Sequence, residues 1–154
     1  MSRAFVKEQD IELGEAIADR PISPHPNFVT AEGLARIDAD IIRLQQEHAS
    51  AQAREDRGAL ARIARDLRYW AARRATAQVV DPPSDKAKVQ FGSTVTLARD
   101  GDRRQTYRIV GEDEAEPSRG TLSYASPLAR ALTGRERGEV VAMGNAEYEI
   151  IEIA

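Results

Sequence analysis

Two stretches with apolar residues at alternating spacings of three and four limit the fold of this chain more than any other feature. The apolar positions are Leu34, Ile37, Ile41 and Leu44 in the first stretch and Leu60, Ile63, Leu67 and Trp70 in the second. His48 and Arg74 come next in the two series. This spacing is typical of helices that pack as a coiled coil, and an apolar face of this kind needs a partner that buries it.

The periodic pattern breaks over residues 51–58, between the two stretches. Two apolar faces of matching length on either side of one break predict an antiparallel helical hairpin. A single long helix is the alternative, because the alanines at 51 and 53 favour helix and Gly58 only weakens it. Thr30 can cap the first helix, and Pro82-Pro83 ends the second.

After residue 85 the apolar period changes to two, which predicts β-strands. The expected strands cover residues 89–91, 94–97, 106–110, 120–124, 140–143 and 148–153, with a hairpin turn at 100–102. One short amphipathic helix follows Ser126-Pro127 and runs to Gly134. The predicted fold class is α+β: an antiparallel α-helical hairpin (coiled coil) followed by a small antiparallel β-sheet domain with one short helix.

Composition narrows the possible functions. The 154 residues include no cysteine and only two histidines, in different segments, which argues against disulfides, thiol catalysis and a cysteine or histidine metal site. The net charge of −3 argues against a free-standing nucleic-acid binder of the basic-patch kind. No apolar run approaches the ~20 residues of a membrane span, and no secretory signal is recognisable at the start. We expect a cytoplasmic monomer without membrane contact.

Residues 107–141 contain an ordered series of motifs. Tyr-Arg-Ile-Val-Gly ends a strand at Gly111, the acids Glu112-Asp113-Glu114 follow, and Ser-Pro-Leu-Ala-Arg opens the short helix at Ser126. This series resembles the C-terminal domain of the bacterial Gre transcript-cleavage factors, the GreA/GreB family. The segments 29–33 (Val-Thr-Ala-Glu-Gly), 77–81 (Ala-Gln-Val-Val-Asp) and 91–95 (Phe-Gly-Ser-Thr-Val) resemble it too. The resemblance covers residues 29–154 and implies an FKBP-like sheet domain and RNA polymerase as partner.

The expected organisation has four parts: a flexible Pro-rich N-terminal arm at 1–29, the hairpin at 30–80, a linker at 81–87 and the FKBP-like polymerase-binding domain at 88–154. Residues 11–18 of the arm are compatible with a short helix. We expect the arm to have no counterpart in established members of the family.

The resemblance draws attention to the hairpin tip, where established members carry acidic residues that help hold magnesium in the polymerase active site. That motif is absent, and the nearest substitute is Glu55-Asp56 between Arg54 and Arg57. Two adjacent carboxylates could bind a hard cation; alternatively, Asp56 caps the second helix and both acids favour its dipole. The hairpin is also short, since about 20 residues per helix at ~1.5 Å each reach only ~30 Å. We expect no cofactor, with Mg only at the polymerase active site.

Polymerase contacts in the sheet domain are implied by the resemblance at Asp113, Glu114, Ser126, Pro127 and Arg130. The plainer interpretation is a solvated acidic turn followed by a Ser126-Pro127 helix cap.

The second helix is basic through Arg62, Arg65, Arg68, Arg73 and Arg74. Such a face is usually only solvated, but Arg62, Arg65 and Arg68 could face a channel wall or nucleic acid. Trp70 lies on the apolar side and is expected in the core; an exposed patch with Tyr69 is the alternative.

Three functions remain open. The first is a non-enzymatic regulator that binds RNA polymerase at its secondary channel, with the sheet domain docking and the hairpin inserting, near nascent RNA or DNA and without efficient transcript cleavage. The second is stimulation of cleavage in backtracked complexes, with Glu55 and Asp56 aiding the polymerase magnesium. The third is a protein-interaction module unrelated to polymerase. Prolyl isomerase activity is not expected, because the sheet half has few aromatic residues to line such a pocket.

Overall fold

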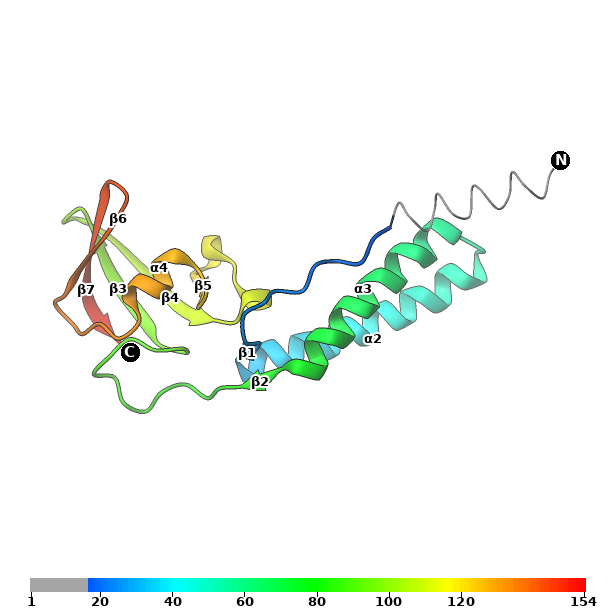
Figure 1. Cartoon of the computed structure of the whole chain (residues 1–154), viewed down its shortest axis with the longest axis horizontal. Coiled ribbons are helices and arrows are strands. Elements are labelled where there is room, and N and C mark those ends of the chain that lie inside the picture. The colour runs from blue at the N-terminus through cyan, green and yellow to red at the C-terminus, as the bar shows by residue number, and fades with distance from the viewer. Residues whose placement is uncertain (1–16) are drawn as a thin grey trace. The chain divides into compact units, whose positions relative to one another are not determined.

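The computed structural model of the chain describes residues 17–154 (Figure 1). These residues form two compact units. One contains residues 36–76 together with the arm up to Pro24, and the other contains residues 25–35 and 77–154. The helix considered for residues 11–18 falls largely outside the described residues, and Ile17 and Ala18 are not helical. No helix among residues 17–154 is long and apolar enough to cross a bilayer.

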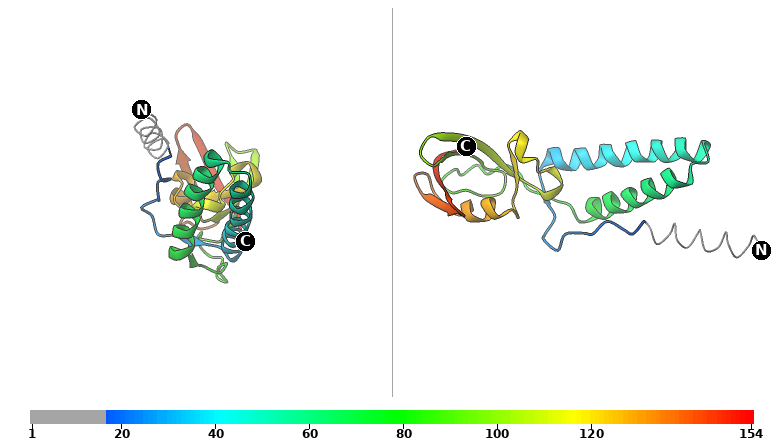
Figure 2. Two further views of the ribbon diagram at one scale, coloured as in Figure 1. Left: turned by 90° about the vertical axis from the view of Figure 1, so that its right-hand side faces the viewer. Right: turned by 90° about the horizontal axis from the view of Figure 1, so that it is seen from above.

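The first unit is an antiparallel helical hairpin, which confirms this part of the predicted fold class (Figures 1 and 2). Helix α2 (Ala31–Ala53) and helix α3 (Arg57–Thr76) are separated by residues 54–56 alone. The middle residue of this turn, Glu55, has a φ of 54°, a left-handed conformation that a continuous right-handed helix cannot contain. The alternative of a single long helix is therefore wrong.

The apolar face of α2 is buried more deeply than that of α3. Ile37 and Leu44 on α2 are 2% and 4% exposed, whereas Ile63, Leu67 and Trp70 on α3 are half-buried. Trp70 is thus only partly a core residue. The difference leaves part of the apolar surface of α3 open to a further segment or ligand.

The second unit is built on a five-stranded sheet with the order β5-β4-β3-β7-β6. Its strands are β3 (Thr94–Arg99), β4 (Arg103–Val110), β5 (Thr121–Ser123), β6 (Val140–Met143) and β7 (Ala146–Ile153). Neighbouring strands are antiparallel, except that β5 pairs with β4 in parallel. Between these two strands the chain returns along the sheet through two short 3-10 helices, η1 (Glu112–Glu114) and η2 (Pro117–Arg119). The sheet is therefore mixed rather than wholly antiparallel.

The core of the second unit lies between this sheet and helix α4 (Pro127–Leu132). Leu97, Ile109 and Ile150 come from the three central strands and Leu132 from α4, and none of the four is more than 1% exposed. Burial of one such aliphatic side chain contributes about 1.5–3 kcal/mol. The predicted short helix after Ser126 is confirmed by α4.

The strand predicted for residues 89–91 does not form. Val89 is instead a buried core residue, 1% exposed, and only Lys88 makes an isolated bridge, to Glu136. Gly92 has a φ of +86°, which turns the chain between this segment and β3. The apolar pattern at this place reflects packing into the core and not pairing in the sheet.

A parallel pair of very short strands, β1 (Phe28–Val29) and β2 (Gln78–Val79), also belongs to the second unit. The ring of Phe28 packs on that of Tyr124 with 5.4 Å between centroids, and the Tyr124 hydroxyl donates a hydrogen bond to the carbonyl oxygen of Pro26. These contacts attach the segment before α2 to the sheet. Strands of this length show no alternating pattern, so the sequence did not predict them.

Candidate functional site

The hairpin tip carries the acidic pair that was considered both as a metal site and as a helix cap. Asp56 Oδ1 accepts a hydrogen bond from the backbone N–H of Ala59 at 3.1 Å, and the N–H of Asp56 donates to the carbonyl oxygen of Ala51 at 3.0 Å. Asp56 is therefore the N-cap of α3, while Glu55 is exposed beside it. Within residues 17–154, no three histidine, cysteine, aspartate or glutamate side chains are grouped so that they could hold a metal ion.

Removal of this cap should weaken α3. We expect Asp56→Ala to lower the free energy of unfolding by about 1 kcal/mol, because the N–H of Ala59 loses its acceptor. Asp56→Asn retains a capping oxygen and should remain close to the native chain. Urea unfolding followed by far-ultraviolet circular dichroism measures both variants, and equal losses in the two would assign the effect to charge and contradict the cap.

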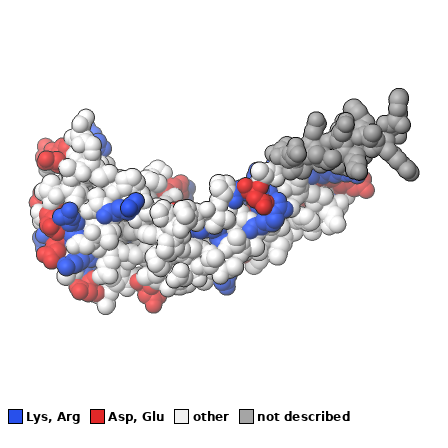
Figure 3. All heavy atoms as spheres, viewed as in Figure 1, with Lys and Arg blue, Asp and Glu red and all other residues white. Residues whose placement is uncertain are grey.

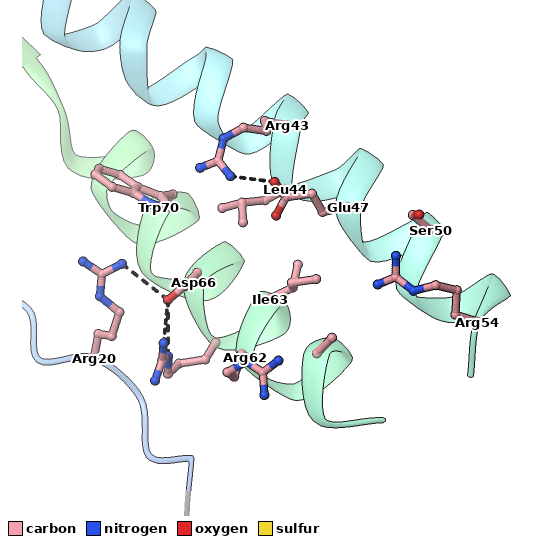
Figure 4. A pocket seen from close by; sticks show the side chains of 12 residues that line it. Arg20, Arg43, Leu44, Glu47, Ser50, Arg54, Arg62, Ile63, Asp66 and Trp70 are labelled. Carbon is pink, nitrogen blue, oxygen red and sulfur yellow. Dashed lines mark hydrogen bonds and ion pairs between the residues drawn. The ribbon is translucent and has the colours of Figure 1, made fainter. Parts of the chain in front are cut away.

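A groove of about 570 Å³ lies within the hairpin unit, and Figure 4 shows the arm, α2 and α3 around it. Its arginines are Arg20, Arg43, Arg54, Arg62 and Arg65. Its apolar residues are Leu44, Ala59, Ile63 and Trp70. The lining also includes Ser50 and two acids, Glu47 and Asp66.

Both carboxylates of the groove are already paired. Arg43 donates a hydrogen bond to Glu47 at 2.8 Å, and this bond is the main cause of the raised pKa of Arg43. Asp66 lies 3.2 Å from Arg65 and 3.4 Å from Arg20. The other two arginines of the lining, Arg54 and Arg62, take no part in the ion pairs among the described residues. The groove therefore has a surplus of positive charge. Such a surface attracts phosphate-bearing molecules.

The three arginines of α3 that were predicted to face a channel or nucleic acid differ in their surroundings. Arg62 and Arg65 line the groove. The side chain of Arg68 is 55% exposed, and its Nε lies 2.7 Å from Oδ1 of Asp19 in the arm. Arg73, which was counted with the basic face, is only 2% exposed and does not belong to a solvated surface. Figure 3 shows basic and acidic side chains close together over this unit.

In the second unit, the acidic turn η1 holds the first turn of α2. Glu114 accepts hydrogen bonds from the backbone N–H of Thr30 at 3.0 Å, from that of Gly111 at 3.1 Å, and from the Thr30 hydroxyl. The Thr30 hydroxyl oxygen accepts from the N–H of Gly33 at 3.0 Å, so Thr30 is the N-cap that the sequence predicted. A Cβ at Gly33 would overlap the Glu114 carboxyl group. Glu114 therefore has an internal structural role.

The exposed carboxylate of Glu32 lies in the same first turn of α2 and has a lowered pKa. The largest cause is the hydrogen bond from its own backbone N–H, followed by the Thr30 side chain and the charge of Arg108. Nη2 of Arg108 lies 3.6 Å from Oε2 of Glu32. These groups favour the charged form, which places a negative charge at a helix N-terminus.

Of the remaining predicted contact residues, three belong to α4 or its cap and Asp113 belongs to η1. Ser126 Oγ accepts a hydrogen bond from the N–H of Ala129 at 3.4 Å, and Pro127 occupies the first helical turn. The helix cap expected from Ser126-Pro127 is thus present. Arg130 is exposed, while Asp113 in η1 is half-buried. Contact of these residues with a partner stays a prediction.

The sequence analysis missed the groove, because its lining combines the arm with both helices of the hairpin and the turn between them. Arg20 comes from the arm, Arg43 from α2, Arg54 from the turn after α2, and Arg62 and Arg65 from α3. One signal was available: in an antiparallel hairpin, residues at similar distances before and after the turn face each other. Counting outward from Glu55, the middle of the turn, places Arg43 near Asp66.

Fold and site together define a class of protein in which a helical hairpin with a cationic groove is followed by a small mixed sheet domain. The family model described as "Transcription elongation factor, GreA/GreB, C-term" matches residues 84–154. A transcription elongation factor GreA of Paracoccus denitrificans is 36% identical, over 99% of this chain and 95% of that protein. A protein of the same name from Pseudomonas putida is 38% identical, over 83% and 81%.

The chain therefore belongs to the GreA/GreB family. The solved structure of a prokaryotic transcription elongation factor GreA/GreB from Nitrosomonas europaea is 20% identical, with a TM-score of 0.42, over 83% of this chain and 98% of that one. Because the match to the Paracoccus protein takes in 99% of this chain, it reaches into the N-terminal arm, for which we expected no counterpart.

Proposed function

We propose that this chain is a monomeric, cytoplasmic regulator of transcription elongation that binds RNA polymerase at the secondary channel and is not itself an enzyme. In this proposal the sheet domain docks on the polymerase and the hairpin inserts toward the active site, without efficient transcript cleavage. The names of the relatives support an elongation factor. The surplus of arginine in the groove supports a hairpin that approaches RNA, DNA or an acidic channel wall.

The arrangement of the tip carries the proposal that cleavage is inefficient. The carboxylate of Asp56 caps α3. Of the two tip acids, only Glu55 has no part in that cap and could be used as a metal ligand. A magnesium ion shared with a partner takes its ligands from several oxygens at once. A tip of this kind is better suited to occupying a channel than to holding a metal ion.

For docking, we assign the contacts to Asp113, Ser126, Pro127 and Arg130, around η1 and the start of α4. Glu114 would act there indirectly, because its carboxylate holds the acidic turn against Thr30 and Gly111. Loops presented by a rigid sheet are common contact sites, which supports this assignment.

The test is RNA cleavage in a backtracked elongation complex, with a GreA that cleaves efficiently as the positive control. We expect little or no shortening of the transcript with this protein alone. When it is mixed with the control GreA, we expect it to reduce the cleavage by that factor, because both would occupy one channel. If it neither cleaves nor competes, the polymerase proposal is wrong and a protein-interaction module becomes the better interpretation.

The second candidate function is stimulation of transcript cleavage, and the exposed carboxylate of Glu55 is the observation that favours it. The same assay tests this candidate. The suitable variant is Glu55→Gln with Asp56→Asn, because the amides remove both charges and the asparagine still caps α3. If the native protein shortens the transcript and this variant does not, the tip acids assist the polymerase magnesium. Asp56→Ala is unsuitable here, since it also weakens the helix.

A further inference from the structure

The described part of the arm lies against α3, and acidic and basic groups alternate in the contact. Asp19 pairs with Arg68 at 2.7 Å, and the next residue, Arg20, pairs with Asp66 at 3.4 Å. The guanidinium of Arg20 also lies 3.8 Å from the centre of the Tyr69 ring. Three interactions within two residues of the arm give it a defined place on α3.

The contacts with Arg68 and with the two aromatic rings occupy groups that a nucleic-acid strand could otherwise use. Asp19 neutralises Arg68, one of the three arginines proposed to face nucleic acid. Arg20 adds a fourth interaction at the groove itself, because its guanidinium lies 5.7 Å from the centre of the Trp70 ring, and Trp70 lines the groove. An extended nucleic-acid strand stacks its bases on such rings and pairs its phosphates with such arginines.

The contacts are also of a kind that a polyanion can displace. The side chains of Asp19 and Arg68 are 70% and 55% exposed, and those of Arg20 and Asp66 are 38% and 29% exposed. Exposed ion pairs are weak and are screened by salt. Pro21 follows directly and Pro24 comes three residues later. Both favour an extended chain, and residues 17–27 contain no helix that would be lost if the arm left α3.

We propose that the arm is a strap that masks the basic face of α3, and that single-stranded nucleic acid binds this face by displacing Asp19 from Arg68. The inference rests on the proposed function insofar as α3 is taken to face nucleic acid. It adds regulation to that site: the affinity of the face is set by competition with the chain's own aspartate.

The test is binding of the full chain to fluorescein-labelled oligouridine RNA at low salt, measured by fluorescence anisotropy. Asp19→Asn should raise the affinity about two- to fivefold, the range expected when one exposed ion pair no longer competes. Asp38→Asn is the matched control, because it makes the same charge change and breaks another exposed ion pair of the same unit, Arg74–Asp38 at 2.6 Å, which joins α2 to α3 and not to the arm. If both variants gained RNA affinity equally, net charge alone would explain the effect and the strap proposal would be wrong.

Release of the arm has its own readout, since Trp70 is the only tryptophan of the chain. Acrylamide quenching of its fluorescence should increase in Asp19→Arg, where the arm is repelled, and return toward the native value in Asp19→Arg with Arg68→Asp. Absence of this return would show that the pair does not hold the arm and would overturn the proposal. The proposal that the arm masks the basic face of α3 would also be wrong if Asp19→Asn left the RNA affinity unchanged, or if no variant bound RNA. Neither assay contains polymerase, so these failures leave the elongation proposal to be decided by the cleavage assay.

Discussion

Gly33→Ala is expected to lower the free energy of unfolding by about 2 kcal/mol, although alanine is the better helix former by ~1 kcal/mol. The added Cβ would overlap the carboxyl group of Glu114 and force it away. Displacement removes the acceptor of the backbone N–H groups of Thr30 and Gly111. Unpaired donors of this kind cost about 1–3 kcal/mol each, more than the gain in helix propensity. Urea unfolding measures the difference.

A double-mutant cycle with Glu114→Ala tests whether the clash between the new Cβ and the Glu114 carboxyl group causes the loss of stability. The single variant Glu114→Ala should lose about 3 kcal/mol, since the same hydrogen bonds disappear. In its background the clash is absent, so Gly33→Ala should now stabilise the chain by ~1 kcal/mol. The change of sign corresponds to a coupling of roughly 3 kcal/mol, at the upper end for residues in contact.

Gly58→Ala is the matched control for this cycle, because Gly58 lies in the first turn of the other helix. A Cβ there would lie 3.4 Å from Arg62 and 3.8 Å from Asp56, ordinary contact distances. We expect this variant to be at least as stable as the native chain. A destabilisation by Gly33→Ala that persists without the Glu114 side chain would contradict the proposed clash.

The contact between Gly33 and Glu114 also shows how far the structure could be predicted from the sequence. Thr30 was predicted as the cap of α2, because serine, threonine, aspartate and asparagine before an apolar periodic stretch are a local signal. Gly33 lies three residues after Thr30, where a capping box has an acid, and the neighbouring sequence gives no reason for a glycine there. The carboxylate that fills this place comes from Glu114, 84 residues after Thr30. No local sequence pattern predicts a hydrogen bond over that separation. Glu114 therefore looked like a surface acid.

The same distinction applies to the rest of the fold and to the site. The helices, α4 and the strands over 94–99 and 146–153 follow from periods of 3.6 and 2, which are local. Val89 alternates like a strand residue but is buried by α4 and the sheet, so its pattern was ambiguous. The parallel pairing of Ile109 with Leu122 depends on the path of the intervening chain. The arginine groove could be recognised only after the arm and the two helices of the hairpin had been placed.

The larger functional effect is expected from the basic face of α3. Arg62→Glu, Arg65→Glu and Arg68→Glu together should weaken competition with a cleaving GreA in the backtracked complex by roughly tenfold or more, because each reversal replaces attraction to phosphate or an acidic wall by repulsion. The three residues are spaced by three along one helix and are neighbours on its surface. The measurement is the concentration of this protein that halves cleavage by the control factor.

Two features of the triple variant make the result interpretable. Arg65 and Arg68 have side chains that are 31% and 55% exposed, and Arg62 is exposed, so the hairpin should remain folded, as circular dichroism can verify. The control carries Arg103→Glu, Arg104→Glu and Arg137→Glu, which make the same charge change at exposed positions of the sheet unit. Equal losses in both variants would mean that net charge alone steers binding. Full competition by the α3 variant would show that this face does not meet the polymerase complex, and the hairpin would then have to act through its tip or its other helix.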